Sequence, residues 1–178
     1  MKKVLVISTS PRKNSNSEML ADEFLRGAQD AGHEAEKLSL RGADLRSCRG
    51  CMACIGTGRC PIADDVADIL RRMHDADVIA FATPIYYFEM SGQMKTLLDR
   101  CNPLYGGDYR FTDIYLLTAA AEDAPDTPER ARIGLTGWVD CFPRASLCGT
   151  AFAGGVGMPG EATNHPALRE AYELGRRA

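Results

Sequence analysis

A run of hydroxyl, amide and cationic side chains follows the first apolar stretch of the chain. From Ser8 to Ser17 the sequence reads STSPRKNSNS, in which only Pro11 interrupts the polar and charged side chains. A helical pattern begins at about Ser17, so the run ends at a helix N-terminus, where free N–H groups and the helix dipole favour an anion. This arrangement predicts a phosphate site. The alternative is that Ser15 and its neighbours only cap the helix, for which one such residue is enough.

Four of the seven cysteines lie within thirteen residues. Their spacing, C-x2-C-x2-C-x5-C followed by proline, is close to the C-x2-C-x2-C-x3-C-P run of bacterial ferredoxins, with a longer last gap. Three thiols at two-residue gaps can surround one compact centre, and a fourth can close it. Three nearby arginines would partly offset the negative charge of such a centre. The pattern predicts a [4Fe–4S] cluster held by Cys48, Cys51, Cys54 and Cys60.

Other uses of these thiols stay open at this point. Zinc sites favour two separated cysteine pairs over three cysteines in succession. Either C-x-x-C pair could serve thiol or disulfide redox chemistry. The thiols could also be reduced and play no chemical role.

A third pattern, Gly155-x-Gly157-x-x-Gly160, matches a dinucleotide-binding motif on paper. That motif joins the first strand of a βαβ unit to its helix, whereas this one follows the last predicted strand and contains Pro159. We therefore predict a flexible loop there and assign no role to Glu161.

Five strand-like stretches alternate with five helical patterns, which predicts a doubly wound parallel sheet in one domain over residues 1–178. The strands are expected at 4–7, 35–40, 78–82, 114–121 and 145–153, and the cysteines lie in a long loop at 41–63. Ligands bind at the carboxyl ends of the strands in such sheets. This rule gathers three loops into one site: 8–17, 83–91 and 118–127.

The second of these loops begins a stretch that reads TPIYYFEMSGQMKTLLDR, from Thr83 to Arg100. Its aromatic residues would provide flat walls for a planar ring system, and exposed N–H groups could reach the heteroatoms of that ring. The alternative is that Tyr86, Tyr87 and Phe88 belong to the core or to a dimer interface.

Together, the two loops resemble those of the flavodoxin-like NAD(P)H-dependent FMN reductase family, and the cysteine spacing resembles that of its iron–sulfur flavoprotein branch. The resemblance implies a five-stranded parallel sheet of order 2-1-3-4-5. It implies that the FMN phosphate is held by Ser10, Arg12, Ser15, Asn16 and Ser17. It implies that the isoalloxazine ring is lined by Pro84, Ile85, Tyr86 and Tyr87, and bordered on its other side by Thr118 and Ala119. No side chain is assigned as catalytic, because the flavin carries the redox chemistry.

The predicted function is an FMN-dependent oxidoreductase that transfers electrons from NAD(P)H or a protein donor to a small-molecule or protein acceptor. The alternative is a non-enzymatic electron carrier, and a zinc- or thiol-based sensor on the same fold is a third reading. The resemblance also implies a homodimer or homotetramer, with Tyr86, Phe88 and Met90 as candidate interface residues.

Composition narrows the choice of partners and compartment. The 178 residues carry a formal net charge of -3, too small to predict a nucleic-acid or membrane partner. No apolar stretch approaches the ~20 residues of a membrane span, and no signal peptide is recognisable. The odd number of cysteines favours reduced thiols, so a cytoplasmic location is expected.

Overall fold

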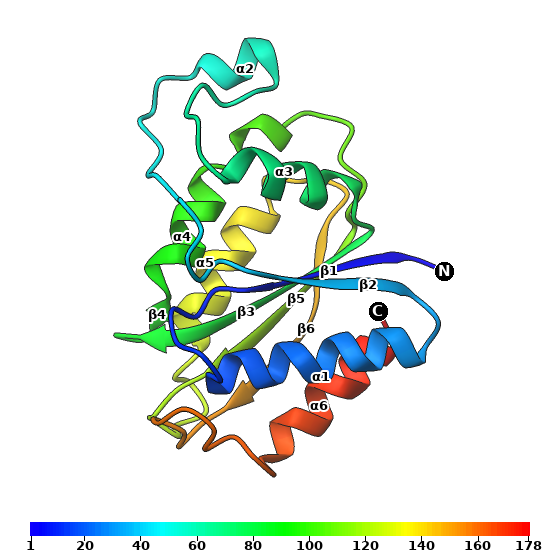
Figure 1. The fold of residues 1–178 in the computed structure, drawn as a ribbon, viewed down its shortest axis with the longest axis vertical. Coiled ribbons are helices and arrows are strands. Elements are labelled where there is room, and N and C mark those ends of the chain that lie inside the picture. The colour runs from blue at the N-terminus through cyan, green and yellow to red at the C-terminus, as the bar shows by residue number, and fades with distance from the viewer.

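The computed structural model describes residues 1–178 and has a five-stranded parallel sheet at its centre (Figure 1). Its spatial order is β2-β1-β3-β5-β6, which is 2-1-3-4-5 when only the parallel strands are counted. The predicted doubly wound sheet is therefore confirmed. These strands are β1 (Lys3–Ser8), β2 (Glu34–Ser39), β3 (Val78–Tyr86), β5 (Asp113–Ala119) and β6 (Ser146–Ala153).

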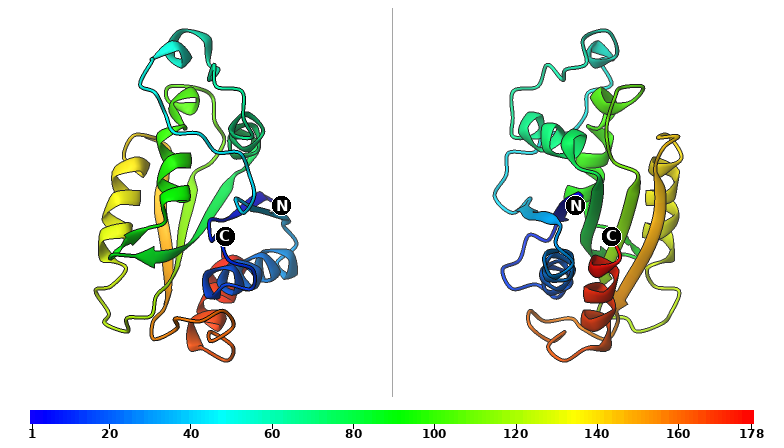
Figure 2. Two further views of the ribbon diagram at one scale, coloured as in Figure 1. Left: turned by 60° about the vertical axis from the view of Figure 1, so that its left-hand side comes forward. Right: turned by 90° about the vertical axis from the view of Figure 1, so that its right-hand side faces the viewer.

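Helices cover both faces of the sheet (Figures 1 and 2). On one face lie α1 (Asn16–Asp30) and α6 (Pro166–Arg176), and on the other lie α3 (Val66–Asp75), α4 (Gly92–Asp99) and α5 (Glu129–Val139). Successive residues of a strand point to opposite faces. Val4 and Val6 of β1 accordingly join the core beneath α1 and α6, while Leu5 and Ile7 join the core beneath the other three helices. None of the helices combines the length and the apolar character needed to cross a membrane.

The structure departs from the expected elements in two places. Strand β3 continues past Pro84 to Tyr86, because the two-residue strand β4 (Glu89–Met90) folds back and pairs with it in antiparallel fashion. The cysteine-rich loop contains a short helix, α2 (Ala53–Thr57), and a 3-10 helix, η1 (Asn102–Leu104), follows α4. Helix α2 lies at the far end of an excursion that projects from the body of the molecule (Figures 1 and 2).

A fully enclosed ion pair closes the base of this excursion. The Arg100 guanidinium contacts the Asp64 carboxylate at 2.7 Å, and neither side chain is exposed to solvent. Asp64 also accepts hydrogen bonds from the backbone N–H groups of Arg46 and Val66, at 3.0 and 3.2 Å. Arg46 and Asp64, which flank the clustered cysteines, are thereby fastened to the residue that follows α4.

Helices α1 and α6 approach closely where each has a glycine. A Cβ atom on Gly27 would lie 2.1 Å from the carbonyl oxygen of Tyr172, and one on Gly175 would lie 2.1 Å from that of Phe24. Real Cβ atoms do not come so near to backbone oxygen. These two glycines therefore set the separation of the helices, and with it the position of α1, whose N-terminus faces the predicted site.

Replacing Gly27 with alanine is expected to lower the free energy of unfolding by about 1–3 kcal/mol, because the helices must separate to admit the methyl group. Gly137 on α5 is a matched control, since a Cβ there meets nothing within 4 Å. Gly137→Ala should be neutral or stabilise by up to about 1 kcal/mol through helix propensity. Denaturant unfolding of both variants measures the difference. Equal effects would contradict the close-packing account.

Candidate functional site

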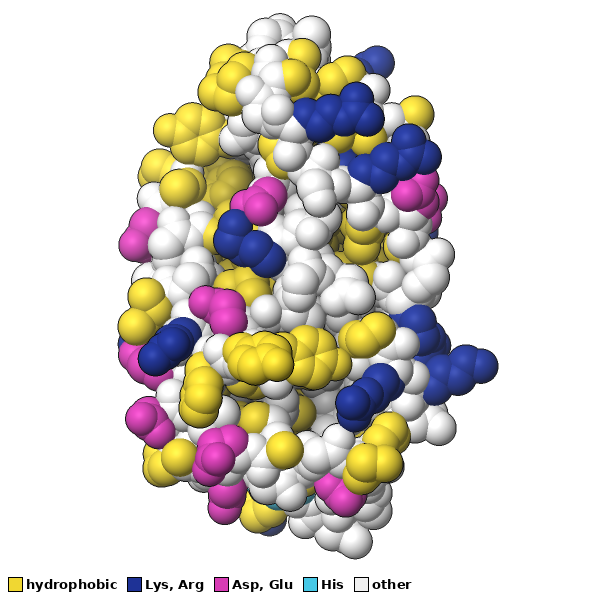
Figure 3. All heavy atoms as spheres, turned by 90° about the vertical axis from the view of Figure 1, so that its left-hand side faces the viewer, with side chains coloured by type: hydrophobic (Ala, Val, Ile, Leu, Met, Phe, Trp, Pro, Cys, Tyr) yellow, Lys and Arg dark blue, Asp and Glu magenta, His cyan; other side chains and the backbone are white.

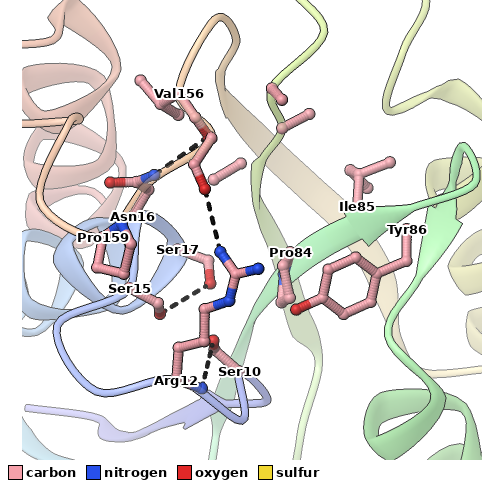
Figure 4. Close-up of a pocket in the computed structure, with 14 residues that line it drawn as sticks. Ser10, Arg12, Ser15, Asn16, Ser17, Pro84, Ile85, Tyr86, Val156 and Pro159 are labelled. Atoms are coloured by element: carbon pink, nitrogen blue, oxygen red, sulfur yellow. Dashed lines mark hydrogen bonds between the residues drawn. The ribbon is translucent and has the colours of Figure 1, made fainter.

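A pocket of about 190 Å³ opens at the carboxyl ends of β1, β3 and β5, where the sequence predicted a site (Figure 4). Four loops form its walls: those that follow β1, β3 and β5, and a fourth that follows β6. The lining residues are Ser10, Arg12, Ser15, Asn16, Ser17, Pro84, Ile85, Tyr86, Ala119, Ala120, Ala121, Val156, Gly157 and Pro159.

Nine of the eleven residues predicted to bind FMN line this pocket. The other two do not. Tyr87 is 98% exposed, at the tip of the turn between β3 and β4. Thr118 is buried within the sheet, and its hydroxyl donates to the carbonyl oxygen of Ala151 at 3.3 Å.

The loop after β1 presents hydrogen-bond donors to the pocket. Ser15 caps α1, and its hydroxyl accepts from the N–H of Glu18 at 3.2 Å. The N–H groups of Asn16 and Ser17 have no acceptor in the protein. The Ser17 hydroxyl lies 3.4 Å from that of Ser15, and both side chains are buried in the pocket wall. Capping thus occupies one residue and leaves the neighbouring donors available.

Buried hydroxyl groups hold the loops after β1 and β3 together. The hydroxyls of Thr9 and Ser91 lie 2.9 Å apart, and the N–H of Ser91 donates to the Thr83 hydroxyl at 3.0 Å. Ser91 also caps α4 by accepting from the N–H of Met94 at 3.3 Å. These contacts fix the distance between the hydroxyl-rich loop and the wall formed by Pro84 and its neighbours.

The Arg12 side chain reaches into the pocket and is the only cationic group in its wall (Figure 4). Its guanidinium donates to the carbonyl oxygen of Gly157 at 3.0 Å. A neutral acceptor holds the guanidinium there, so its positive charge is not matched by a carboxylate. An anion entering the pocket can therefore pair with Arg12.

The wall formed by the loop after β6 was missed at the sequence level. This segment includes the three glycines predicted to form a flexible loop; the structure shows a loop there, held by hydrogen bonds to its surroundings. The Asn16 side chain donates to the carbonyl oxygens of Val156 and Met158, and the Glu161 carboxylate accepts from Gly157 and Met158. The rule that ligands bind at the carboxyl ends of parallel strands could have indicated this loop, because the carboxyl end of β6 lies at the same edge of the sheet.

The aromatic turn between β3 and β4 is exposed and conformationally unusual. Ile85 pairs with Met90 and Tyr86 with Glu89, so Tyr87 and Phe88 form a two-residue hairpin turn. Both have positive φ angles, 51° and 65°, which such turns require and which normally favour asparagine and glycine. Hydrophobic side chains form a band across this side of the molecule (Figure 3). Met90, a candidate interface residue, is instead buried in the core, 5% exposed.

We expect the double substitution Tyr87→Asn, Phe88→Gly to raise the free energy of unfolding by about 1–2 kcal/mol. The left-handed conformation costs non-glycine residues about 1–2 kcal/mol each. Part of that gain is offset because Arg130, 5.8 Å from the Phe88 ring centre, loses its aromatic partner. Tyr105→Asn is the control, because Tyr105 is exposed and has a negative φ of -66°. A destabilised double variant would contradict the strain argument.

Comparison with known sequences identifies the family. The sequence model of the NADPH-dependent FMN reductase family matches residues 2–124. The chain belongs to this family. The matched region contains the hydroxyl-rich loop, the aromatic turn and β5, but it ends before β6 and the loop that follows it.

Curated relatives of this FMN reductase family member include iron–sulfur flavoproteins from archaea. One from Methanocaldococcus jannaschii is 43% identical over 102 residues, which are 57% of this chain and 53% of that protein. Another, from Archaeoglobus fulgidus, is 35% identical over 104 residues, which are 58% of this chain and 47% of that protein. The chain therefore spans about half the length of the curated relatives it matches.

Solved structures confirm the flavodoxin-like fold. The NAD(P)H:quinone oxidoreductase from Methanothermobacter marburgensis has a TM-score of 0.73 and 21% identity, covering 99% of this chain and 96% of that one. An azoreductase from Bacillus anthracis has a TM-score of 0.74 and 19% identity, covering the whole of both chains. At such low identity the likeness concerns the fold alone.

The four clustered cysteines of this FMN reductase family member all carry free thiols. Cys48 and Cys51 are exposed, while Cys54 and Cys60 are partly buried. The structure places no three His, Cys, Asp or Glu side chains as a group that could hold a metal ion, so the thiols share a loop without surrounding a centre. Their ligand role stays a prediction. Asp64 raises the pKa of Arg100, and the nearby Cys60 thiol adds to this shift.

Proposed function

We propose that the chain is an FMN-dependent oxidoreductase, which moves electrons from NAD(P)H or a protein donor to an acceptor. The observation that carries the proposal is the pocket at the α1 N-terminus, where unpaired N–H groups, hydroxyls and one cation converge beside the apolar side chains of Pro84 and Ile85. Membership of the FMN reductase family supports it.

The chain's own groups fit the two ends of FMN. A phosphate monoester carries about two negative charges at neutral pH. The N–H groups of Asn16 and Ser17, the Ser17 hydroxyl and the Arg12 guanidinium would hold it, aided by the helix dipole. Pro84, with Ile85 and Tyr86, would support the ring, and bound FMN would supply both hydride and single-electron chemistry.

The pocket is too small to enclose a whole FMN molecule, which bears on whether the chain forms oligomers. Its volume of about 190 Å³ lies below the ~300–1,000 Å³ typical of enclosed ligand sites. The phosphate end of FMN would be enclosed, and the ring would lie at a rim where Tyr86 is 39% exposed. We propose that a second copy of the chain covers this rim in a homodimer or homotetramer. Sedimentation of the wild type and of a Phe88→Asp variant tests this, with loss of assembly expected in the variant because Phe88 is a candidate interface residue and is 48% exposed.

We propose that the cysteine-rich segment binds a second cofactor. Four unoxidised thiols on one loop suit a [4Fe–4S] cluster by their donor chemistry, with Cys48, Cys51, Cys54 and Cys60 as ligands. The named iron–sulfur flavoproteins among the relatives favour this assignment over zinc. The free state of all seven cysteines also fits a reducing compartment, and we place the protein in the cytoplasm.

The decisive experiment measures FMN, iron and acid-labile sulfide per chain on anaerobically purified protein, followed by steady-state NAD(P)H oxidation. About one FMN with about four iron and four sulfide is expected. Turnover with a pyridine nucleotide supports an enzyme, whereas bound FMN without turnover would favour a flavodoxin-like electron carrier. Failure to bind added FMN would overturn the proposal, and zinc without iron would reassign the cysteines.

A further inference from the structure

The Asn16 side chain faces the loop after β6, and its hydrogen-bonding groups are occupied there. Its amide nitrogen donates to the carbonyl oxygens of Val156 and Met158, at 3.1 and 2.9 Å. Its carbonyl oxygen accepts from the N–H of Ala162 at 3.0 Å. Both amide hydrogens are used, and the residue is 6% exposed. Only the backbone N–H of Asn16 is left for a ligand in the pocket.

Two further contacts fix the same loop. The Glu161 carboxylate accepts from the N–H groups of Gly157 and Met158, at 2.7 and 2.9 Å. The N–H of Val156 donates to the carbonyl oxygen of Ala120 at 2.8 Å, which ties the loop to the end of β5. The loop is thus held from α1, from β5 and from within. Val156 and Gly157 then stand in the wall of the same pocket as Ser15, and Figure 4 shows Val156 beside the Asn16 side chain.

We infer that this loop, residues 154–162, is a wall that closes the phosphate end of the pocket, and that Asn16 is a positioning residue for it. The inference rests on the proposed function. A phosphate monoester ends at the α1 N-terminus, within reach of Arg12. A dinucleotide flavin would continue beyond that phosphate, where the loop bonded to Asn16 contributes Val156 and Pro159 to the pocket wall. The wall therefore favours binding of FMN over FAD. Asn16 and Glu161, which hold the loop in place, maintain this preference.

The experiment compares the dissociation constants of FMN, riboflavin and FAD for the wild type and for Asn16→Ala and Glu161→Ala. The wild type is expected to bind FMN at least about tenfold more tightly than FAD, and each variant to reduce that ratio at least about threefold. Glu161→Ala is the more discriminating variant, since the exposed Glu161 carboxylate contacts only the loop. Glu170→Ala is the matched control, because Glu170 is exposed on α6, and its ratio should equal that of the wild type.

Amide hydrogen exchange without flavin gives a second readout. The N–H groups of Gly157 and Met158 should exchange faster in Glu161→Ala than in the wild type. An unchanged FMN-to-FAD ratio in both variants would overturn the inference and leave the proposed function intact. So would a loss of FMN affinity in Asn16→Ala, if riboflavin affinity and the ratio in Glu161→Ala stay unchanged, because that result marks Asn16 as a phosphate ligand. Absence of FMN binding by the wild type would instead overturn the proposed function, and this inference with it.

Discussion

Substituting Arg100 with methionine is expected to lower the free energy of unfolding by about 3–5 kcal/mol. The change leaves the Asp64 carboxylate enclosed without its partner, and a charge removed from water is costly unless it is paired. The long apolar side chain of methionine fills much of the space, so the loss reports the missing charge more than a cavity. Denaturant unfolding at neutral pH measures the effect.

Two variants make this prediction specific. Arg71→Met removes the same type of side chain from an exposed pair, in which Arg71 and Asp68 lie 2.6 Å apart, and should cost less than about 1 kcal/mol. The double variant Arg100→Met, Asp64→Leu should recover much of the loss, since it removes the unpaired charge as well. A loss in Arg100→Met no larger than that in Arg71→Met would contradict the buried-pair account.

The same pair has a defined pH dependence. Burial raises the pKa of Asp64, but hydrogen bonds from Arg100 and from the backbone outweigh burial, and the pKa lies below its usual range. A carboxyl with a lowered pKa in the folded state stabilises the protein above its unfolded pKa of about 3.9, and that contribution is lost as the pH falls through the folded value. The unfolded pKa is common to wild type and Arg100→Met, whereas in the folded variant the buried Asp64 carboxyl without its partner has a raised pKa. The difference in the free energy of unfolding should therefore be largest near neutral pH and shrink as the pH falls from the raised pKa of the variant to the lowered pKa of the wild type.

Much of the fold followed from local pattern. Short apolar runs such as 4–7 and 78–82 indicated strands buried on both faces, and the loops after them marked the carboxyl edge of the sheet. The sheet order came from the family resemblance, because alternating elements do not determine which strands are neighbours. Strand β3 was predicted too short, since its last residues are strands only through pairing with β4, and a two-residue partner leaves almost no signal of its own.

Only the part of the site that lies in loops with a local sequence signal was predicted. Residues on the first and third strand loops carry recognisable chemistry, and the structure brings them together. The wall formed by Val156 and Gly157 depends on contacts with Asn16 across 140 residues of sequence, which no local pattern reveals. Tyr87 was placed in the pocket by the family resemblance, but its side chain, at the tip of the hairpin turn, is exposed to solvent.

The proposal that the FMN phosphate lies at the α1 N-terminus predicts a second large effect. Replacing Ser17 with aspartate should weaken FMN binding about 10³-fold, because a carboxylate would face the phosphate in the pocket, and like charges brought together cost several kcal/mol. Riboflavin, which has no phosphate, should bind within about threefold of the wild-type affinity. Helix α1 should tolerate the change, since an acidic residue in the first turn of a helix is stabilising by about 0.3–1 kcal/mol.

The neutral variant Ser17→Asn separates charge from shape in this experiment, because asparagine has nearly the size and form of aspartate. It should lose no more than about tenfold in FMN affinity, the effect of one altered neutral hydrogen bond. Fluorescence titration of both flavins against the three proteins, with melting temperatures measured alongside, gives the comparison. Equal losses in the aspartate and asparagine variants would show that the phosphate does not lie at the α1 N-terminus. Parallel losses for FMN and riboflavin would mean that Ser17 shapes the pocket as a whole, whereas a loss confined to FMN and to the charged variant places the phosphate beside Ser17.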